Sequence, residues 1–288
     1  QFVFQMFHVE HFLNKDFLVF KCWLIYGIII VGGLMANILS FFNQKGGVGK
    51  TTTTLNLAAA LVDKGRKVLV VDVDPQANLS SGITDGSTEI MGNVYDLIMA
   101  NADINSVISD TSHKGLKLIA GSSDSAGMEI ELAVNGNWHY LLRNKLQEIS
   151  PDYDYIFIDC PPSLGILSLM SLNASDGVIS TIQSEYYALE GVTQLMKTVN
   201  LVKENYNSGL EIKGILLTMH DSRNNLAQDV EAEVRGFFKD LVFKTAIPRN
   251  VTLAEAPSHG LSIFDYDKRS AGAQAYKKFA NEFDKRFR

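Results

Sequence analysis

The sequence predicts an α/β protein whose core is a doubly wound, mostly parallel β-sheet flanked by helices. Two observations lead to this fold class. From Met35 onward, short runs of Val, Ile, Leu and Phe alternate with longer segments in which apolar residues recur at helical spacing. The apolar runs are nearly continuous, which is typical of strands that helices cover on both faces. In such sheets, ligands bind at the carboxyl ends of the strands.

The elements follow one another in regular order. The first strand leads into a glycine-rich loop and a helix, the second and fourth strands end in aspartates, and the last helix carries aromatic residues at helical spacing. Expected strands cover 37–43, 67–73, 116–120, 154–159, 177–182, 211–219 and 241–247. Expected helices cover 50–63, 137–149, 164–173, 187–206, 224–238 and 270–286.

Residues 80–115 are richest in Ser, Gly, Asp and Asn. We expect this stretch to be a surface excursion rather than a domain boundary. No internal repeat or low-complexity linker interrupts the chain, so residues 35–288 are predicted to form a single domain.

The composition excludes several classes of protein. With 288 residues, 46% of them hydrophobic and 20% charged, the chain is neither disordered, nor collagen, nor a coiled coil. Two cysteines argue against a disulfide framework and against a structural zinc site. A net charge of −6 argues against a surface that binds nucleic acid everywhere, but it leaves room for a local basic patch.

The slightly positive mean hydropathy of +0.04 comes largely from residues 17–36. The uncharged part of this run, 22–36, has 15 residues, fewer than the roughly 20 that cross a bilayer as a helix. A membrane anchor and an extra packed helix are two interpretations of residues 1–34. We favour a third, in which 1–34 is a non-native leader translated from upstream of a start at Met35.

The glycine-rich loop after the first strand indicates a phosphate-binding site and reads Lys45-Gly46-Gly47-Val48-Gly49-Lys50-Thr51-Thr52. Its glycines allow backbone N–H groups to surround a polyphosphate, and the following helix adds its dipole. Lys50 is expected to contact the β- and γ-phosphates, and Thr51 to bind Mg²⁺. The usual motif has glycine six residues before the lysine, where this chain has Gln44.

Carboxylates end two of the expected strands. Asp72 and Asp74 stand two residues apart, so they are expected to share a face of the strand, beside the phosphate loop. Such a pair can hold Mg²⁺ and position a water molecule. Asp159 ends a second apolar strand, where it is expected to hold the metal directly or through water.

The motif Lys-Gly-Gly-x-Gly-Lys-Thr resembles the deviant Walker A loop of the ParA/MinD ATPases, a group of P-loop NTPases. The resemblance implies ATP and Mg²⁺ as cofactors, and an ATP-dependent homodimer in which Lys45 reaches the partner's phosphates. It also implies that Asp74 takes part in hydrolysis and that Asp159 acts as the Walker B residue. The catalytic residues so expected are Lys45, Lys50 and Asp74, and the metal ligands are Thr51, Asp74 and Asp159.

Further motifs resemble the chromosomal ParA (Soj) branch, and the resemblance spans about residues 36–286. They are Asn43-Gln44, Asp72–Gln76, Asp159–Leu164, Glu185–Gly191, Ile247–Val251 and Glu255–Gly260. In that branch the segment around Pro248 and Arg249 packs near the adenine. The branch implies a cytoplasmic, nucleoid-associated ATPase that segregates chromosomes or plasmids and hydrolyses ATP when a ParB-type protein stimulates it.

The same resemblance implies DNA binding without sequence preference, through phosphate contacts that salt weakens. Arg223 is the first candidate contact, and Lys203, Arg235 and Lys239 are secondary candidates. Thr252 departs from the arginine that many relatives have, which leaves the strength of this DNA surface open.

Two other functions compete. A MinD-like regulator of cell division would bind a membrane, and Tyr276, Phe279, Phe283 and Phe287 with nearby lysines form a basic amphipathic helix of the kind that can do so. The same helix can instead pack on the sheet, and we expect no stable membrane association. A metabolic P-loop enzyme would need a second-substrate site, which the sequence does not indicate.

Overall fold

The computed structural model describes residues 35–185 and 188–288, without the side chains of residues 135 and 188–190. The predicted leader, 1–34, lies outside the described residues. Ala36–Arg288 forms one compact unit, and no boundary divides residues 80–115 from the rest of it. No helix in the described ranges combines the length and the apolar character needed to cross a membrane.

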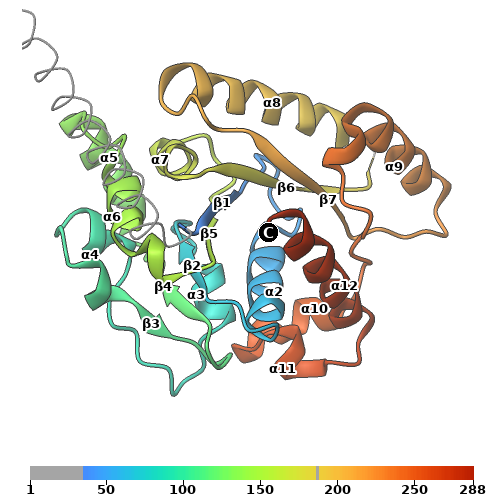
Figure 1. Ribbon diagram of the computed structural model, residues 1–288, viewed down its shortest axis with the longest axis horizontal. Helices are drawn as coiled ribbons and strands as arrows, with labels where there is room; N and C mark the ends of the chain where they lie inside the picture. Colours follow the sequence, from blue (N-terminus) through green and yellow to red (C-terminus); the bar gives the residue numbers. More distant parts are fainter. Residues whose placement is uncertain (1–34, 186–187) are drawn as a thin grey trace, which may run out of the picture. The chain divides into compact units, whose positions relative to one another are not determined.

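A seven-stranded sheet forms the centre of this unit, with the strand order β3-β4-β2-β5-β1-β6-β7 (Figure 1). All neighbouring strands pair in parallel except β3 with β4. The predicted fold class is therefore confirmed. The strands are β1 (Asn37–Phe41), β2 (Val68–Asp72), β3 (Ser109–Asp110), β4 (Lys117–Ile119), β5 (Tyr155–Asp159), β6 (Gly177–Gln183) and β7 (Ile212–Thr218).

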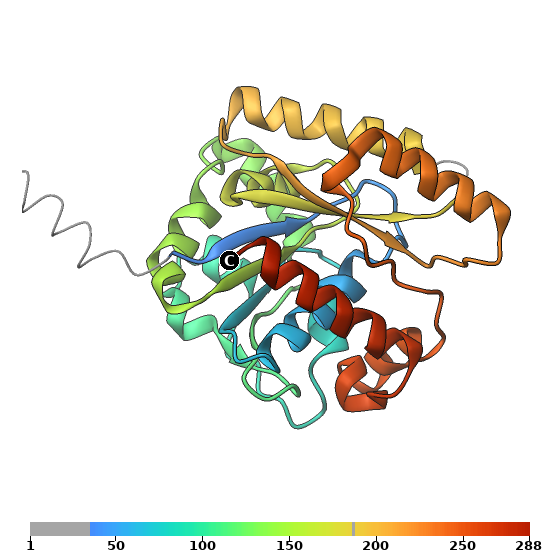
Figure 2. The ribbon, with the colours of Figure 1, turned by 45° about the vertical axis from the view of Figure 1, so that its right-hand side comes forward.

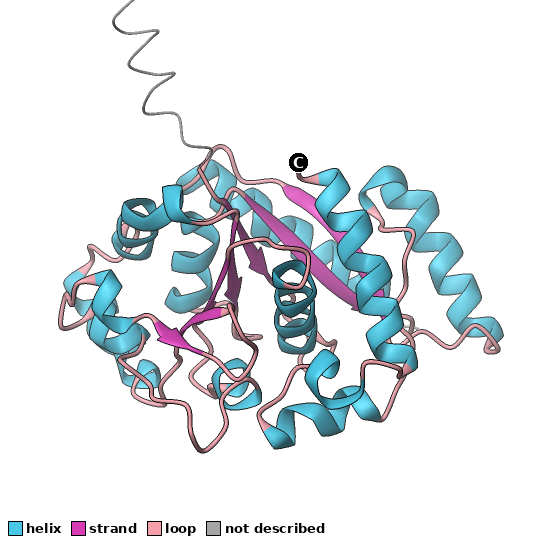
Figure 3. Cartoon of the chain, turned by 60° about the horizontal axis from the view of Figure 1, so that its bottom comes forward, coloured by secondary structure: helices cyan, strands magenta, loops and turns pink. Residues whose placement is uncertain are grey.

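Helices cover both faces of the sheet (Figures 2 and 3). Along β2, Val68 and Val70 pack against one helical layer, while Leu69 and Val71 pack against the other. The first layer contains α2 (Lys50–Val62), α3 (Asn78–Gly82), α10 (Thr252–Glu255), α11 (Ile263–Asp267) and α12 (Ala271–Arg286). The second contains α4 (Val94–Ile98), α5 (Ser125–Asn135), α6 (Leu141–Ile149), α7 (Ile166–Ala174), α8 (Ala188–Asn205) and α9 (Asn225–Phe238). Because buried strands must be apolar on both faces, this arrangement explains the continuous apolar runs of the sequence.

The aromatic stripe of the last helix belongs to the core. Tyr276, Phe279 and Phe283 are at most 1% exposed. Phe283 makes an edge-on ring contact with Phe157 of β5, and Phe279 makes one with Phe243. The apolar side of α12 is thus buried against the sheet, as we expected, and is not available to a lipid surface in this conformation.

The predicted strand at 241–247 is wrong. Only Val242 forms a bridge, to Ile215 of β7. The backbone N–H groups of Phe243 and Ile247 donate to carbonyl oxygens of β7, but side chains bind the backbone groups between them. The guanidinium of Arg235 donates to the carbonyl oxygens of Phe243 and Lys244, at 3.0 and 3.3 Å, and the carboxylate of Glu282 accepts from the N–H groups of Lys244 and Thr245. The segment is therefore a loop whose apolar side chains pack against the hydrophobic core and whose backbone groups bind side chains as well as β7.

The stretch 80–115 does more than cover the surface. Val94, Leu97, Ile104 and Val107 are buried in the same core as the sheet, and α4 begins with a capping box between Asn93 and Asp96. The expectation of a surface excursion is wrong for these residues. These apolar residues are widely spaced within a polar stretch, so they do not show the periodicity of a buried helix or strand.

Candidate functional site

The phosphate loop connects the carboxyl end of β1 to the amino end of α2. Gly47 and Gly49 have φ angles of +73° and +84°, which place them in the left-handed region that favours glycine. Gly46 and Gly47 are exposed, and Val48 is buried, with its carbonyl oxygen accepting a 2.8 Å hydrogen bond from the Thr218 hydroxyl of β7. The loop is therefore exposed to solvent at Gly46 and Gly47, and it is held to β7 at Val48.

Lys50 is the first residue of α2 and is only 7% exposed. Its ammonium donates to the carbonyl oxygen of Lys45 at 3.3 Å. Burial lowers the pKa of the Lys50 ammonium, and the carboxylates of Asp159 and Asp74 partly oppose this. A buried ammonium with one carbonyl partner retains two free donors, which suits an incoming phosphate oxygen.

Thr51 and Asp159 meet beside this lysine, although 108 residues separate them in the chain. The Thr51 hydroxyl donates to Asp159 at 2.7 Å, and the Thr54 hydroxyl donates to the other carboxylate oxygen at 3.3 Å. Asp159 is fully buried, and this burial, together with the nearby charge of Asp72, raises the pKa of its carboxyl group to about 8.

This donor set fits magnesium. Mg²⁺ prefers oxygen ligands and is commonly held by one or two protein groups together with phosphates and water. No cluster of three or more His, Cys, Asp or Glu side chains suited to a metal occurs in the described parts of the chain. Thr51 and Asp159 therefore suit a magnesium ion whose other ligands are phosphate oxygens and water.

Asp72 and Asp74 end the neighbouring strand, and they differ in environment. Asp72 is fully buried, and its carboxylate accepts from the backbone N–H and the hydroxyl of Ser80, at 2.9 and 2.7 Å. Burial raises the pKa of Asp72 to about 6. Asp74 is 8% exposed and accepts from the backbone N–H of Gln76 at 2.9 Å. Asp72 thus holds α3 in place through Ser80, while Asp74 lies near Lys50. The sequence interpretation missed Ser80.

Lys45 projects from the outer side of the loop. Its ammonium is 3.0 Å from Glu185 at the end of β6, and both side chains are about half exposed. Glu185 was part of a family motif, but nothing in the local sequence indicated that it would pair with Lys45.

A cavity of about 320 Å³ lies beside the phosphate loop. Gly49 and Thr52 line it together with Pro248 and Arg249. The structure thus joins two segments that the sequence interpretation connected only by resemblance. Residues of the cavity that the sequence interpretation missed include Thr218, Met219, Leu253 and Tyr276.

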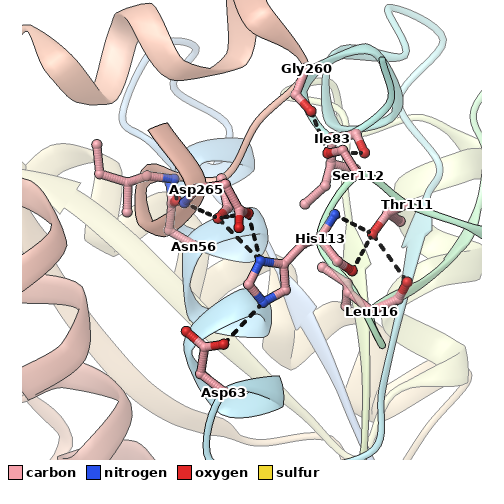
Figure 4. Close-up of polar contacts among 11 residues, drawn as sticks. Asn56, Asp63, Ile83, Thr111, Ser112, His113, Leu116, Gly260 and Asp265 are labelled. Atoms are coloured by element: carbon pink, nitrogen blue, oxygen red, sulfur yellow. Dashed lines mark hydrogen bonds and ion pairs between the residues drawn. The ribbon is translucent and has the colours of Figure 1, made fainter. Parts of the chain in front are cut away.

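A polar cluster behind the site ties α2 to α11 and α3 (Figure 4). Nδ1 of the His113 imidazole is 2.6 Å from the carboxylate of Asp265 in α11. Nε2 is 3.5 Å from the carboxylate of Asp63, the residue directly after α2. The Ser112 hydroxyl donates to the carbonyl oxygens of Ile83 and Gly260. We call residues 111–116 with these partners the His113 clasp.

Arg223, the first candidate for DNA contact, lies far out on the loop before α9. Its guanidinium is 88% exposed and forms a two-pronged ion pair with Asp221, with both N–O distances 2.9 Å. These hydrogen bonds lower the pKa of Asp221 to about 2. Of the secondary candidates, Arg235 pairs with Glu231 and supports the 241–247 loop, whereas Lys203 and Lys239 are exposed.

Comparisons with known proteins agree on one group. A family model described as an AAA domain matches residues 36–212. Chromosome-partitioning ATPase Soj of Treponema pallidum is 49% identical over 250 residues, which are 86% of this chain and 97% of that protein. Sporulation initiation inhibitor protein Soj of Bacillus subtilis is 48% identical over 248 residues, 86% of this chain and 98% of that protein.

Among solved structures, the septum site-determining protein MinD of Pyrococcus horikoshii, crystallised with Mg-ADP, is 29% identical. It superimposes with a TM-score of 0.70 over 87% of this chain and 97% of that chain. The fold is shared across these proteins, but the sequence similarity to the Soj proteins is much higher.

Proposed function

The chain belongs to the Soj/ParA family of chromosome-partitioning ATPases, and on this basis we propose that it is a DNA-partitioning switch driven by ATP. In this proposal the chain binds ATP with Mg²⁺, forms a homodimer around the nucleotide, and binds DNA without sequence preference. A ParB-type protein on a centromere-like site then stimulates hydrolysis, and the dimer releases the DNA. The protein would act on the nucleoid in the cytoplasm.

The contact between Thr51 and Asp159, beside the buried ammonium of Lys50, is the observation that carries the nucleotide part of the proposal. Lys50 and the backbone N–H groups of Gly46–Thr52 would hold the phosphates. Thr51, Asp74 and Asp159 would hold Mg²⁺, which neutralises phosphate charge when it is bound. Pro248 and Arg249, which line the same cavity as Gly49, would lie against the adenine.

Asp74 is the candidate for activating water. It is nearly buried, it is close enough to Lys50 for the two charges to interact, and its carboxylate accepts a hydrogen bond from the backbone N–H of Gln76. We assign to Asp74 the orientation of the attacking water and the acceptance of its proton as the γ-phosphate is transferred. Asp72 is a poorer candidate because Ser80 already occupies its carboxylate.

Lys45 would complete the partner's site across the dimer. Its ammonium is exposed, and it is held by a surface ion pair with Glu185, which is a weak contact that an incoming phosphate can replace. The MinD-like alternative finds less support. The aromatic side of α12 is buried, and the sequence similarity favours Soj over MinD.

The test is co-sedimentation of the full chain with DNA and with anionic liposomes, in ATP and in ADP. We expect ATP-dependent binding to DNA and no binding to liposomes. Asp74→Ala should still bind ATP, hydrolyse it about 100-fold more slowly, and remain on DNA. Rapid turnover by Asp74→Ala would refute its role, and ATP-dependent binding to liposomes without DNA binding would favour the MinD-like function.

A further inference from the structure

A second recess lies away from the phosphate loop, between the end of α2, α11 and the first half of α12. Its volume is about 480 Å³. Four cationic side chains line it, together with one carboxylate, Asp63. The cations are Lys64, Lys268, Arg269 and Lys277. We call this surface the basic recess.

Most of its positive charge is unpaired. Lys64 donates to Asn281 and lies 3.6 Å from Asp284. The side chains of Lys268, Arg269 and Lys277 have neither a hydrogen bond nor an ion pair within the described part of the chain. The amino end of α12, where Ser270 caps the helix, lies beside the recess and adds the positive end of its dipole.

Three unpaired cations around one recess differ both from exposed cations that stand singly and from exposed cations that are paired with acids. Lys117 pairs with Asp110 at 2.7 Å, Lys213 pairs with Glu211 at 2.7 Å, and Arg223 is paired with Asp221. Arg223 must therefore break a two-pronged ion pair before it can bind a phosphate, whereas Lys268, Arg269 and Lys277 have no side-chain partner in the described residues to lose. The recess offers the stronger attraction for an anion.

The recess is separate from the nucleotide site. It shares no lining residue with the 320 Å³ cavity. Lys64 follows Lys50 by 14 residues, mostly along α2, which corresponds to about 20 Å at 1.5 Å per residue. An anion in the recess would therefore not compete with ATP for the phosphate loop.

We propose that the basic recess binds phosphates of the DNA backbone. Its polar donors are exposed lysine, arginine and amide groups rather than buried groups of fixed direction, which suits contacts that position DNA without reading its sequence. The inference rests on the proposed function, because it locates the DNA contact that the partitioning cycle requires. It also gives a physical reason for DNA binding by a chain that has Thr252 and a paired Arg223.

The test compares two triple variants of the full chain. The first replaces the unpaired cations of the recess, Lys268→Ala/Arg269→Ala/Lys277→Ala. The control replaces three other exposed lysines without recorded side-chain partners in the described residues, Lys67→Ala/Lys244→Ala/Lys285→Ala, and so removes the same charge. Affinity for random-sequence duplex DNA is measured in ATP over a series of salt concentrations.

We expect the recess variant to bind DNA at least about tenfold more weakly at physiological ionic strength. The slope of log affinity against log salt should become shallower by about 2 to 3, since each phosphate contact contributes about 0.9. The slope of the control variant should stay closer to the wild-type slope than that of the recess variant does. Both variants should retain the wild-type melting temperature and ATP affinity, and Arg269→Ala alone should lower the slope by about 0.9.

Three results would overturn the inference. If wild-type protein binds DNA and the recess variant binds it with the same slope, the recess assignment fails while the partitioning function stands. If wild-type protein binds no DNA in ATP, both fail. If the recess variant loses affinity for inorganic tripolyphosphate or for anionic vesicles but keeps its affinity for DNA, the recess serves a small anion or a lipid surface instead.

Discussion

Lys45 and Lys50 stand five residues apart in one loop, and they meet opposite environments. Lys50 is buried, and burial lowers the pKa of its ammonium, whereas Lys45 is exposed and paired with Glu185. A buried ammonium is poorly solvated, so the protein bears part of the desolvation penalty before any ligand arrives. The two lysines should therefore respond differently to substitution.

Lys50→Met should separate nucleotide binding from stability. Nucleotide-free protein should melt at the same or a higher temperature than wild type, because the variant no longer buries an ammonium. ATP affinity should fall about 100-fold, since hydrogen bonds to charged groups contribute about 1.5–3 kcal/mol each. Calorimetric titration and thermal unfolding measure both effects, with the exposed Lys67→Met as control. Unchanged ATP affinity would contradict the assignment of Lys50.

Glu185→Gln should release Lys45 for the dimer. An exposed ion pair contributes about 0.2–1 kcal/mol, so the melting temperature should change little, and the ATP-dependent dimer should tighten about two- to fivefold. Sedimentation with a non-hydrolysable ATP analogue measures the dimer affinity.

The matched control is Glu211→Gln, which removes the exposed pair with Lys213. It should leave dimerisation unchanged. A weaker dimer in Glu185→Gln would mean that Glu185 supports Lys45 in the assembled state rather than restraining it in the monomer.

At the scale of elements, the His113 clasp joins the end of α2 to α11 and α3 (Figure 4). Burial alone would lower the pKa of the His113 imidazole. The hydrogen bond to Asp265 and the charges of Asp265 and Asp63 more than offset burial, so this pKa lies above its ordinary value. A raised folded-state pKa means that the stabilisation is fully present below about pH 6.5 and is lost as the pH rises through the folded value.

His113→Gln should therefore destabilise the protein more at about pH 6 than at about pH 9. At the lower pH the loss should be about 1.5–3 kcal/mol in the free energy of unfolding, the contribution of a hydrogen bond between charged groups. Thermal and urea unfolding across the pH range measure it. Asp72 and Asp159 also have raised pKa values, so wild type itself loses stability as pH rises, and the prediction concerns the difference between the two proteins.

His259→Gln is the control, because His259 is exposed and stacks on Tyr266. Its effect on the free energy of unfolding should be small. A His113→Gln variant whose loss of stability grows with pH would contradict the clasp.

Helix α5 and the 241–247 loop show where local patterns mislead. In α5, Met128 and Leu132 are buried, whereas Ile130 and Val134 are 73% and 82% exposed, so the apolar residues do not mark a single face. In the loop, Arg235 and Glu282 bind backbone groups that would otherwise need a strand partner. Neither side-chain arrangement can be read from a short window of sequence, because the partners come from distant elements.

At the scale of the whole molecule, the nucleotide site joins parts of the chain from Gly49 to Tyr276. We expect an ATP analogue to slow amide hydrogen exchange in residues 45–52, 217–219 and 247–254 together. At about 100 times the dissociation constant, ligand binding should stabilise the fold by about 2.7 kcal/mol. The basic recess, including Lys268 and Arg269, serves as the internal reference and should show no comparable local protection. Protection limited to residues 45–52 would contradict an adenine position beside Pro248.

The sequence by itself determined the α/β class, the phosphate loop and the aspartates at strand ends, because each of these depends on a few neighbouring residues and their periodicity. Only the tertiary structure decided which distant groups meet. It pairs Thr51 with Asp159, Lys45 with Glu185 and His113 with Asp265, and it brings Pro248 and Gly49 to the same cavity. The physical reason is that such contacts follow from strand order and helix packing, which arise from the whole chain and are not encoded in any local pattern.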